Sequence, residues 1–428
     1  MNKNIIKKEL TIFLILSLIL VTFPLATSEK HTEYNKLSIL FDEKRELHLM
    51  RVEHYLVLKA DKDVNKFNVK YVCPPIYRYQ VPIMVQIFND TSEKVTSYKI
   101  DNDVYKPNKF VNFTVKSMNK DEELLIHFTV WILVENYGFG DVPNYVKFPK
   151  TSELPKEVKK WLTPTEVTQS DNILIKLKAK QIRGLSDNLK RFAGRTAYFI
   201  KNHRFLLFIL ELHTGLLLSQ DAVTTLFING ENVGRAHLAC ALLRSQNVPA
   251  RVLLVNNDQG FWTQMHYMAE YYCPGYGWVL IETTGGKSPY ETKRQVINRI
   301  CYPEDENDTK RDYIFRFMKG EERWIWVENE NIYPYYVNCD EGSKSQMFRE
   351  NIVLINESII NNIFSDTQTT FLKYQHFLGC NLTGDNLTYF SNAVNYQYNA
   401  IQSMKNSNVS SYIHFIGLAD KEYDKISI

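Results

Sequence analysis

The sequence predicts an α+β protein in which an antiparallel β-sandwich comes first, followed by helices, a buried strand and a β-hairpin. Three observations predict this class. Apolar and polar residues alternate between positions 47 and 134, which is typical of half-buried strands. Beyond position 165 the apolar residues recur about every 3.6 positions, the period of a helix. Between positions 262 and 283, two alternating runs flank a Pro-Gly pair, which is the pattern of a hairpin.

The first part of the chain is expected to be all-β. Short alternating runs, of which 126–134 is the clearest, are separated by polar segments, and this spacing favours a β-sandwich domain over 29–150. The stretch 138–165 is rich in proline and charge, which predicts a linker laid along a surface. We therefore place a domain boundary near residue 150.

The second part is expected to be mixed, with helices before strands. Helical periods predict helices over about 173–182, 189–199 and 236–244. The continuous Val and Leu residues of 250–255 then predict a buried strand. We assign residues 151–300 to this core. Residues 301–428 are expected to form a mixed α/β carboxyl-terminal extension with helices around 352–378, and the sequence does not assign its fold.

The composition is that of a folded protein without a dominant charge. The chain has 428 residues, 44% hydrophobic and 23% charged, which is enough for two or three domains. Its 51 Lys and Arg residues against 48 Asp and Glu residues give a formal net charge of +3. Binding to nucleic acid needs a stronger excess of positive charge. We therefore expect no nucleic-acid partner.

The amino terminus has the pattern of a secretion signal. Lys3, Lys7 and Lys8 precede an apolar run over 10–26, and small or polar residues follow it. The run is long enough for an uncleaved membrane anchor to stay open as a second interpretation. Residues 1–28 are thus expected to be a signal peptide or a membrane anchor. The rest is expected to be secreted or to lie on the extracellular side of the cell membrane.

All cysteines and glycosylation sequons lie in the part that would be exported. An oxidising compartment permits disulfides, but the spacing does not give their pairing, and without a Cys-x-x-Cys pair it favours neither a zinc nor a redox motif. The cysteines are Cys73, Cys240, Cys273, Cys301, Cys339 and Cys380. The sequons predict a surface-exposed glycoprotein. They are at Asn89, Asn112, Asn307, Asn356, Asn381, Asn386 and Asn408.

The predicted hairpin brings a histidine and a carboxylate together. The period of two puts Gln264, His266, Met268 and Glu270 on one face of the first strand. A turn centred on residues 274–275 would bring Glu282 to within about one residue of direct opposition to His266. A carboxylate beside an imidazole fixes its tautomer, as a catalytic base requires. A plain His–Glu surface pair is the alternative interpretation.

A family resemblance is carried by one continuous segment, Gly230-Glu-Asn-Val-Gly-Arg-Ala-His-Leu-Ala-Cys-Ala-Leu-Leu-Arg-Ser-Gln-Asn-Val-Pro-Ala-Arg251. Together with His266 and with Gly275-Tyr-Gly-Trp-Val-Leu-Ile-Glu-Thr-Thr284, it resembles the transglutaminase-like core of the papain-like thiol hydrolase superfamily. The resemblance covers roughly residues 155–290. It implies a papain-like fold, with helices packed on an antiparallel sheet, and acyl transfer or amide hydrolysis through a thiolate.

The resemblance also places a catalytic triad, and one member is replaced. Its register puts the nucleophilic cysteine at Asn232, the base at His266 and the orienting carboxylate at Glu282, where the family has aspartate. Where the family usually has a tryptophan, two residues beyond the histidine, this chain has Met268. An amide cannot replace a thiolate. Asparagine is instead a good residue for capping a helix, and we expect Asn232 to cap the helix that follows.

No other residue is an evident replacement for the nucleophile. Cys240 falls in the apolar register of its predicted helix, where cysteine packs as a small hydrophobic residue. Cys273 is seven residues along a strand from His266, and we expect it in a disulfide. We expect no cofactor and no metal, because zinc would need a ligand set beyond His266, Glu270 and Glu282. The acidic run 305–308 is not a calcium-binding loop.

These observations leave three functions open. The leading hypothesis is a secreted or surface pseudoenzyme that has lost catalysis and acts as a binding or scaffold module for a protein or peptide ligand. The alternative is a thiol protease or amide-processing hydrolase, in which His266 and Glu282 act with a cysteine from elsewhere, such as the carboxyl-terminal region. In the third, the β-domain and the aromatic tail mediate adhesion, with the core as a spacer.

Overall fold

The computed structural model describes residues 43–136, 142–203, 219–228, 230–257, 265–290, 295–309, 320–334 and 343–427. All of them belong to one compact unit, residues 42–428. The predicted signal or anchor over 1–28 lies outside the described residues, as do Gln264 and Cys339. None of the helices in the described ranges has the length and apolar character needed to cross a membrane.

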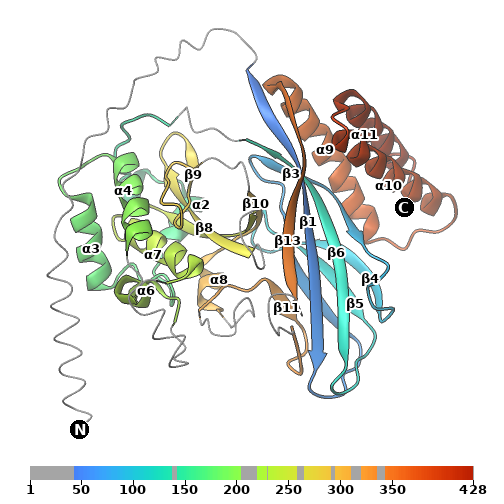
Figure 1. Ribbon diagram of the computed structural model, residues 1–428, viewed down its shortest axis with the longest axis horizontal. Coiled ribbons are helices and arrows are strands. Elements are labelled where there is room, and N and C mark those ends of the chain that lie inside the picture. Colours follow the sequence, from blue (N-terminus) through green and yellow to red (C-terminus); the bar gives the residue numbers. More distant parts are fainter. Residues whose placement is uncertain are drawn as a thin grey trace. The chain divides into compact units, whose positions relative to one another are not determined.

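Two antiparallel sheets contain the strands predicted for the first part of the chain (Figure 1). The first runs in the order β12–β1–β6–β3, with β13 also paired to β1. Its strands are β1 (Lys44–Ala60), β3 (Gln80–Ile87), β6 (Glu123–Glu135), β12 (Ile332–Pro334) and β13 (Lys344–Asn356). The second runs in the order β11–β2–β5–β4. Its strands are β2 (Phe67–Cys73), β4 (Val95–Asn102), β5 (Lys109–Val115) and β11 (Ile325–Val327).

Aromatic rings join the two sheets face to face. The ring of Phe128 on β6 lies 5.2 Å from that of Phe113 on β5 and 5.4 Å from that of Tyr71 on β2. His54 on β1 lies 4.6 Å from Tyr71, ring to ring. Contacts of this kind between inward-facing residues are those of a sandwich.

Strands from the carboxyl-terminal part complete both sheets. β13 pairs along β1 from Lys44↔Asn356 to Tyr55↔Lys344, and β11 pairs with β2. Residues 344–356 are therefore strand, and the helix predicted around 352–378 begins only at Glu357. The boundaries proposed at 150 and 300 stay a prediction. The pairing shows, however, that strands of 301–428 belong to the same sheets as strands of 29–150.

Of the three helices at the end of the chain, two pack on the first sheet, and the third packs on those two (Figure 1). The two are α9 (Glu357–Leu378) and α10 (Gly384–Lys405), and the third is α11 (Val409–Tyr423). The hydroxyl of Tyr374 donates to the carbonyl of Val85 at 2.8 Å, and the side-chain amide of Gln397 donates to that of Ile83 at 2.8 Å. With the sandwich on its other face, β6 is buried along nearly its whole length.

A third antiparallel sheet, with helices packed on it, forms the core predicted for 151–300. Its order is β10–β7–β8–β9. The strands are β7 (Ala250–Asn257), β8 (Met265–Cys273), β9 (Gly277–Ile281) and β10 (Gln295–Ile300). Helix α7 (Asn232–Arg244) packs on β7 and β8 and is buried from Val233 onward except at Arg235. The surrounding helices are α3 (Ile173–Arg183), α4 (Leu189–Asn202), α6 (Ala222–Ile228) and α8 (Pro303–Asn307). The predicted α+β class is confirmed.

The described part of the segment predicted as a surface linker, residues 142–165, packs against this core. It holds the short helices η1 (Thr151–Glu153), α2 (Lys156–Lys159) and η2 (Lys160–Leu162). Trp161 in η2 is 4% exposed, and its indole N–H donates to the carbonyl of Cys301 at 3.0 Å. A buried tryptophan with its N–H satisfied fixes the path of the segment.

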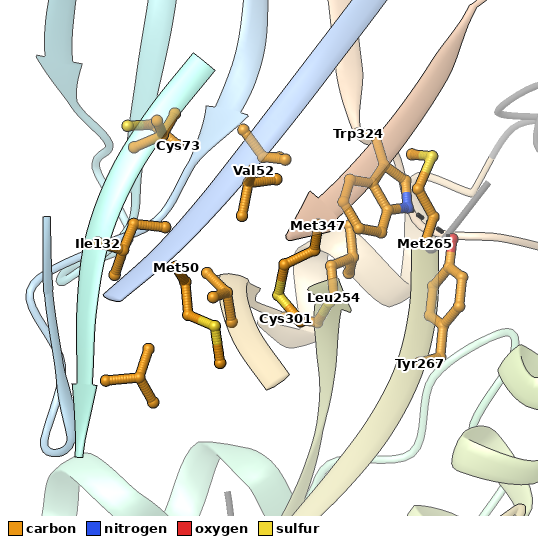
Figure 2. Packing of buried hydrophobic residues seen from close by; sticks show 14 of the residues in the cluster. Met50, Val52, Cys73, Ile132, Leu254, Met265, Tyr267, Cys301, Trp324 and Met347 are labelled. Atoms are coloured by element: carbon orange, nitrogen blue, oxygen red, sulfur yellow. Dashed lines mark hydrogen bonds between the residues drawn. The ribbon is translucent and has the colours of Figure 1, made fainter. Parts of the chain in front are cut away.

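One hydrophobic cluster spans the sandwich and the core (Figure 2). It includes Met50 and Ile132 from the first sheet, Leu254 and Tyr267 from the third, and Trp324, which follows them in the chain. The indole N–H of Trp324 donates to the Tyr267 hydroxyl at 3.1 Å. The segments that the sequence divides at 150 and 300 therefore share buried apolar surface.

Candidate functional site

The β8–β9 hairpin forms with the turn expected from the sequence. Gly275 has a φ of +82°, a conformation that glycine adopts without strain, and it follows Pro274 as in a type II turn. The strands pair from Cys273↔Gly277 to Ala269↔Ile281. Continuing this register would put Thr284 opposite His266. Glu282 is therefore displaced by two residues from direct opposition, one more than the sequence predicted.

The structure nevertheless brings His266 and Glu282 together. The Nε2 atom of His266 lies 3.2 Å from Oε1 of Glu282, and both residues are 8% exposed. The backbone N–H of Thr284 donates to Glu282 Oε1 at 3.0 Å, and the backbone N–H of Gly285 donates to Oε2. Burial by itself raises the pKa of Glu282, but the hydrogen bonds and the charge of His266 outweigh it and hold this pKa below its ordinary value.

Asn232 is the first residue of α7, and it is half-buried. The prediction that its side chain caps the helix is wrong, because the N-cap residue is Glu231, which makes no side-chain capping bond. The backbone N–H of Glu231 instead donates to Oε1 of Gln220 at 2.8 Å. The helix start is thus held by a glutamine from the preceding segment, which the sequence analysis did not single out.

Two glycines allow this close approach of α7 to the preceding segment. A Cβ atom at Gly230 would lie 2.6 Å from Oγ1 of Thr225 and 2.8 Å from Oε1 of Gln220. A Cβ at Gly234 would collide with the same two atoms. Because protein atoms do not pack this closely, a side chain at either position would force Thr225, Gln220 or the first turn of α7 to shift.

Arg235 lies in the first turn of α7, half-buried. Its Nε donates to the carbonyl of Gly230 at 3.1 Å. Burial lowers the pKa of Arg235, while the negative charges of Glu231 and Glu282 act in the opposite direction. The guanidinium is therefore close enough to Glu282 to interact with it electrostatically. Sequence reasoning missed this residue, although it lies inside the segment that carries the family resemblance.

The described cysteines do not supply a thiolate for His266. Cys73, Cys240, Cys273 and Cys301 are buried free thiols, and Cys380, at the end of α9, is half-buried. Burial raises the pKa of Cys73 to about 12 and that of Cys273 to about 11, and it also raises those of Cys240 and Cys301. The disulfide expected at Cys273 is thus not formed. A buried thiol with a raised pKa is a poor nucleophile.

Glu270 lies on the same strand face as His266, but its carboxylate pairs with other residues. Its carboxylate accepts from Nε and Nη2 of Arg251 at 3.0 and 2.8 Å and from the Tyr77 hydroxyl at 3.0 Å. The Arg251 guanidinium stacks over the Trp278 ring at 3.8 Å. In the described part of the chain, no group of three His, Cys, Asp or Glu residues is arranged to hold a metal ion.

Two further ion pairs, both completely buried, join α7 to later parts of the chain. Nε2 of His237 lies 2.8 Å from Oε1 of Glu322, and Nη2 of Arg244 lies 2.6 Å from Oε1 of Glu306. The Thr165 hydroxyl also donates to Glu306 at 2.8 Å. Sequence reasoning missed both pairs, because the carboxylates are 62 and 85 residues from their partners along the chain.

One of the predicted glycosylation sites is not on the surface. Asn112 lies in β5, is 8% exposed, and its side-chain amide donates to Asp101 at 2.8 Å. A glycan cannot be accommodated on a side chain packed within a sheet. The other six sequon asparagines are exposed or half-buried.

One part of the chain matches a family model, and two solved structures resemble the chain distantly. Residues 176–283 match the model of the transglutaminase-like superfamily. Among solved structures, a "putative cysteine protease" from Cytophaga hutchinsonii matches with a TM-score of 0.43 and 13% identity, over 72% of this chain and 98% of that one. A "putative protease" from Parabacteroides distasonis matches with a TM-score of 0.21 and 13% identity, over 54% of this chain and 43% of that one. A search of curated protein sequences gave no match.

Proposed function

We propose that this chain, which carries a transglutaminase-like domain over 176–283, is a secreted or cell-surface binding module that has lost covalent catalysis. It takes a protein or peptide ligand at the surface formed by the first turn of α7 and the β8–β9 hairpin. The observation that carries this proposal is Asn232, an amide where the family resemblance places the thiol. It begins helix α7, which packs on β8, the strand that carries His266 of the assembled His266–Glu282 pair.

The chemistry left at this site is hydrogen bonding and charge. His266 is oriented by Glu282, so it can donate or accept one proton at its other ring nitrogen. Arg235 and Asn232 add a cation and an amide at the start of α7. These groups suit the polar backbone and side chains of a peptide. The location outside the cell is supported by the pattern of residues 1–28.

The experiment restores the missing thiol. In a Cys380→Ser background, which removes the half-buried thiol, we compare the parent with Asn232→Cys. A thiol at position 232 would be at a helix amino terminus near His266, and both lower a thiol pKa. We expect Asn232→Cys to react with iodoacetamide at pH 7 about tenfold faster than an ordinary exposed thiol. We expect the parent to form no acyl-enzyme with peptide thioesters, as checked by intact-mass spectrometry.

The control places the same thiol at a helix start without a histidine. Ser358 is exposed in the first turn of α9, so Ser358→Cys reports the effect of the helix alone. Adding His266→Ala should slow the Asn232→Cys thiol but not the Ser358→Cys thiol. An unreactive Asn232→Cys would contradict the register assigned to residue 232. An acyl-enzyme on the parent that disappears in His266→Ala would establish the thiol hydrolase alternative instead.

A further inference from the structure

Helices α3 and α4, which pack against each other (Figure 1), carry eight basic residues and no acidic one. Those of α3 are Lys176, Lys178, Lys180 and Arg183. Those of α4 are Lys190, Arg191, Arg195 and Lys201. The chain as a whole has a formal charge of only +3, so the positive charge is concentrated on this pair of helices. We call these residues, with the exposed apolar ones described below, the basic α3–α4 face.

Carboxylates do not neutralise these cations. Among the described residues, none of the eight forms an ion pair with an acidic side chain. Their polar contacts go to neutral oxygens, such as Lys178 to Gln181 at 3.0 Å and Lys190 to the carbonyl of Val142 at 2.8 Å. Burial and the charge of Arg191 both lower the pKa of Arg195, which shows that like charges are crowded here. Such a face attracts anions.

Large apolar side chains stand exposed on the same two helices. Ile173 and Leu177, one turn apart on α3, are 64% and 55% exposed, and Tyr198 on α4 is 60% exposed. Leu185, just beyond the end of α3, is fully exposed. The buried residues of α3 are Ile175 and Ala179, so Ile173 and Leu177 lie on its exposed side. Exposed aliphatic residues within a basic surface are typical of helices that lie in a membrane interface.

We propose that the basic α3–α4 face docks onto the surface of an anionic phospholipid bilayer. The cations would meet lipid phosphates, and the apolar side chains of Ile173, Leu177 and Leu185 would enter the boundary with the acyl chains. The long lysine stems can lie along that boundary while their charges stay in water. A soluble polyanion would use the cations but would leave the aliphatic side chains in water. This inference does not depend on the function proposed for the His266 site.

Vesicle binding tests the proposal with the full chain. We expect it to sediment with vesicles of phosphatidylcholine containing about one-third phosphatidylglycerol, and to do so much less at about 0.5 M than at 0.1 M salt. Replacing Lys176, Lys180, Arg191 and Lys201 by Gln should lower the partition coefficient about tenfold or more. Ile173→Ser with Leu177→Ser should lower it at unchanged charge. The fold of each variant is checked by circular dichroism.

A matched control removes the same charge elsewhere. Lys62, Lys66, Lys116 and Lys120 are exposed in loops and at strand ends of the sandwich, and their replacement by Gln should leave vesicle binding within about twofold. An equal loss in this control would overturn the proposal. Residues 1–28 are the same in every variant, so a difference between variants cannot come from that segment. Equal binding of the parent and the four-Gln variant to anionic vesicles would also overturn the proposal. Binding to heparin without binding to anionic vesicles would instead identify a soluble polyanion as the partner.

Discussion

At the scale of single residues, the carboxylate of Glu282 is the best-defined group of the candidate site. It lies two residues off direct opposition to His266, and the extra methylene of glutamate relative to the family's aspartate gives it added reach. Two backbone N–H groups of the following turn, from Thr284 and Gly285, hold it in place. Three hydrogen-bond donors stabilise the charged form of this carboxylate, which explains its lowered pKa.

Glu282→Gln should therefore lose stability in a pH-dependent way. Because the pKa of Glu282 is depressed on folding, its contribution is present above the ordinary value of 4.5 and disappears as the pH falls through the folded value. We expect the variant to be about 1–3 kcal/mol less stable at pH 7 in urea unfolding, and the difference to shrink as the pH falls below 4.5. A difference that stays constant over this range would mean that charge is not its cause.

At the scale of elements, the hairpin depends on one backbone conformation. Gly275 has positive φ, and a Cβ added there would meet no atom within 4 Å. Steric fit therefore plays no part at this position, and only the left-handed conformation favours glycine. The turn sets the register of β8 and β9, and with it the distance between His266 and Glu282.

Gly275→Ala should cost about 1 kcal/mol of unfolding free energy, because an L-residue is strained in this conformation. Gly417 supplies the matched control, since an added Cβ there also meets nothing within 4 Å and the residue lies inside helix α11. Gly417→Ala should stabilise the protein by about 0.5–1 kcal/mol, because alanine is the better helix former. The two variants are compared by urea unfolding. Shifts of the same sign would contradict this account of the turn.

At the scale of the whole molecule, contacts between distant parts of the chain hold the candidate site in position. The buried Arg244–Glu306 pair joins α7 to α8, and Trp324 packs on Tyr267 of β8. Strands β11, β12 and β13 belong to the same sheets as strands before residue 136. Because these segments share one hydrophobic cluster, we expect residues 42–428 to unfold cooperatively.

Glu306→Gln tests this coupling. It would leave the guanidinium of Arg244 charged and fully buried, which costs about 3–5 kcal/mol. The double variant Arg244→Met with Glu306→Met removes both charges and should cost less. It will not be neutral, because Arg244 also donates to the carbonyls of Ala250 and Thr163, at 2.8 and 3.0 Å. Tryptophan fluorescence and circular dichroism should report the same transition for each variant. Separate transitions would show that the segments fold independently.

The local pattern of apolar and polar residues was sufficient to predict several features of the fold. The helices around 173–182, 189–199 and 236–244, the buried strand β7 and the Pro-Gly turn form where the sequence predicts them. The resemblance to the transglutaminase-like family could likewise be recognised, because its motifs lie within one continuous segment, residues 230–284, nearly all of it inside the matched range 176–283. The pairing of His266 with Glu282 followed from the period of two and a short turn. All of these depend on neighbours within a few residues or across one tight turn.

What the sequence by itself determined is the class of fold and the family motifs, and it is the source of the proposal that Asn232 stands in the place of the nucleophile. Only the tertiary structure decided which groups surround that site: Gln220 on the helix start, Arg235 near Glu282, and free, buried cysteines in place of the expected disulfide. It also decided that Ile173 and Leu177 face outward and that 344–356 is a strand of the first sheet. The physical reason is that burial, ion pairing and strand partners depend on segments far apart in sequence, and local periodicity carries no information about them.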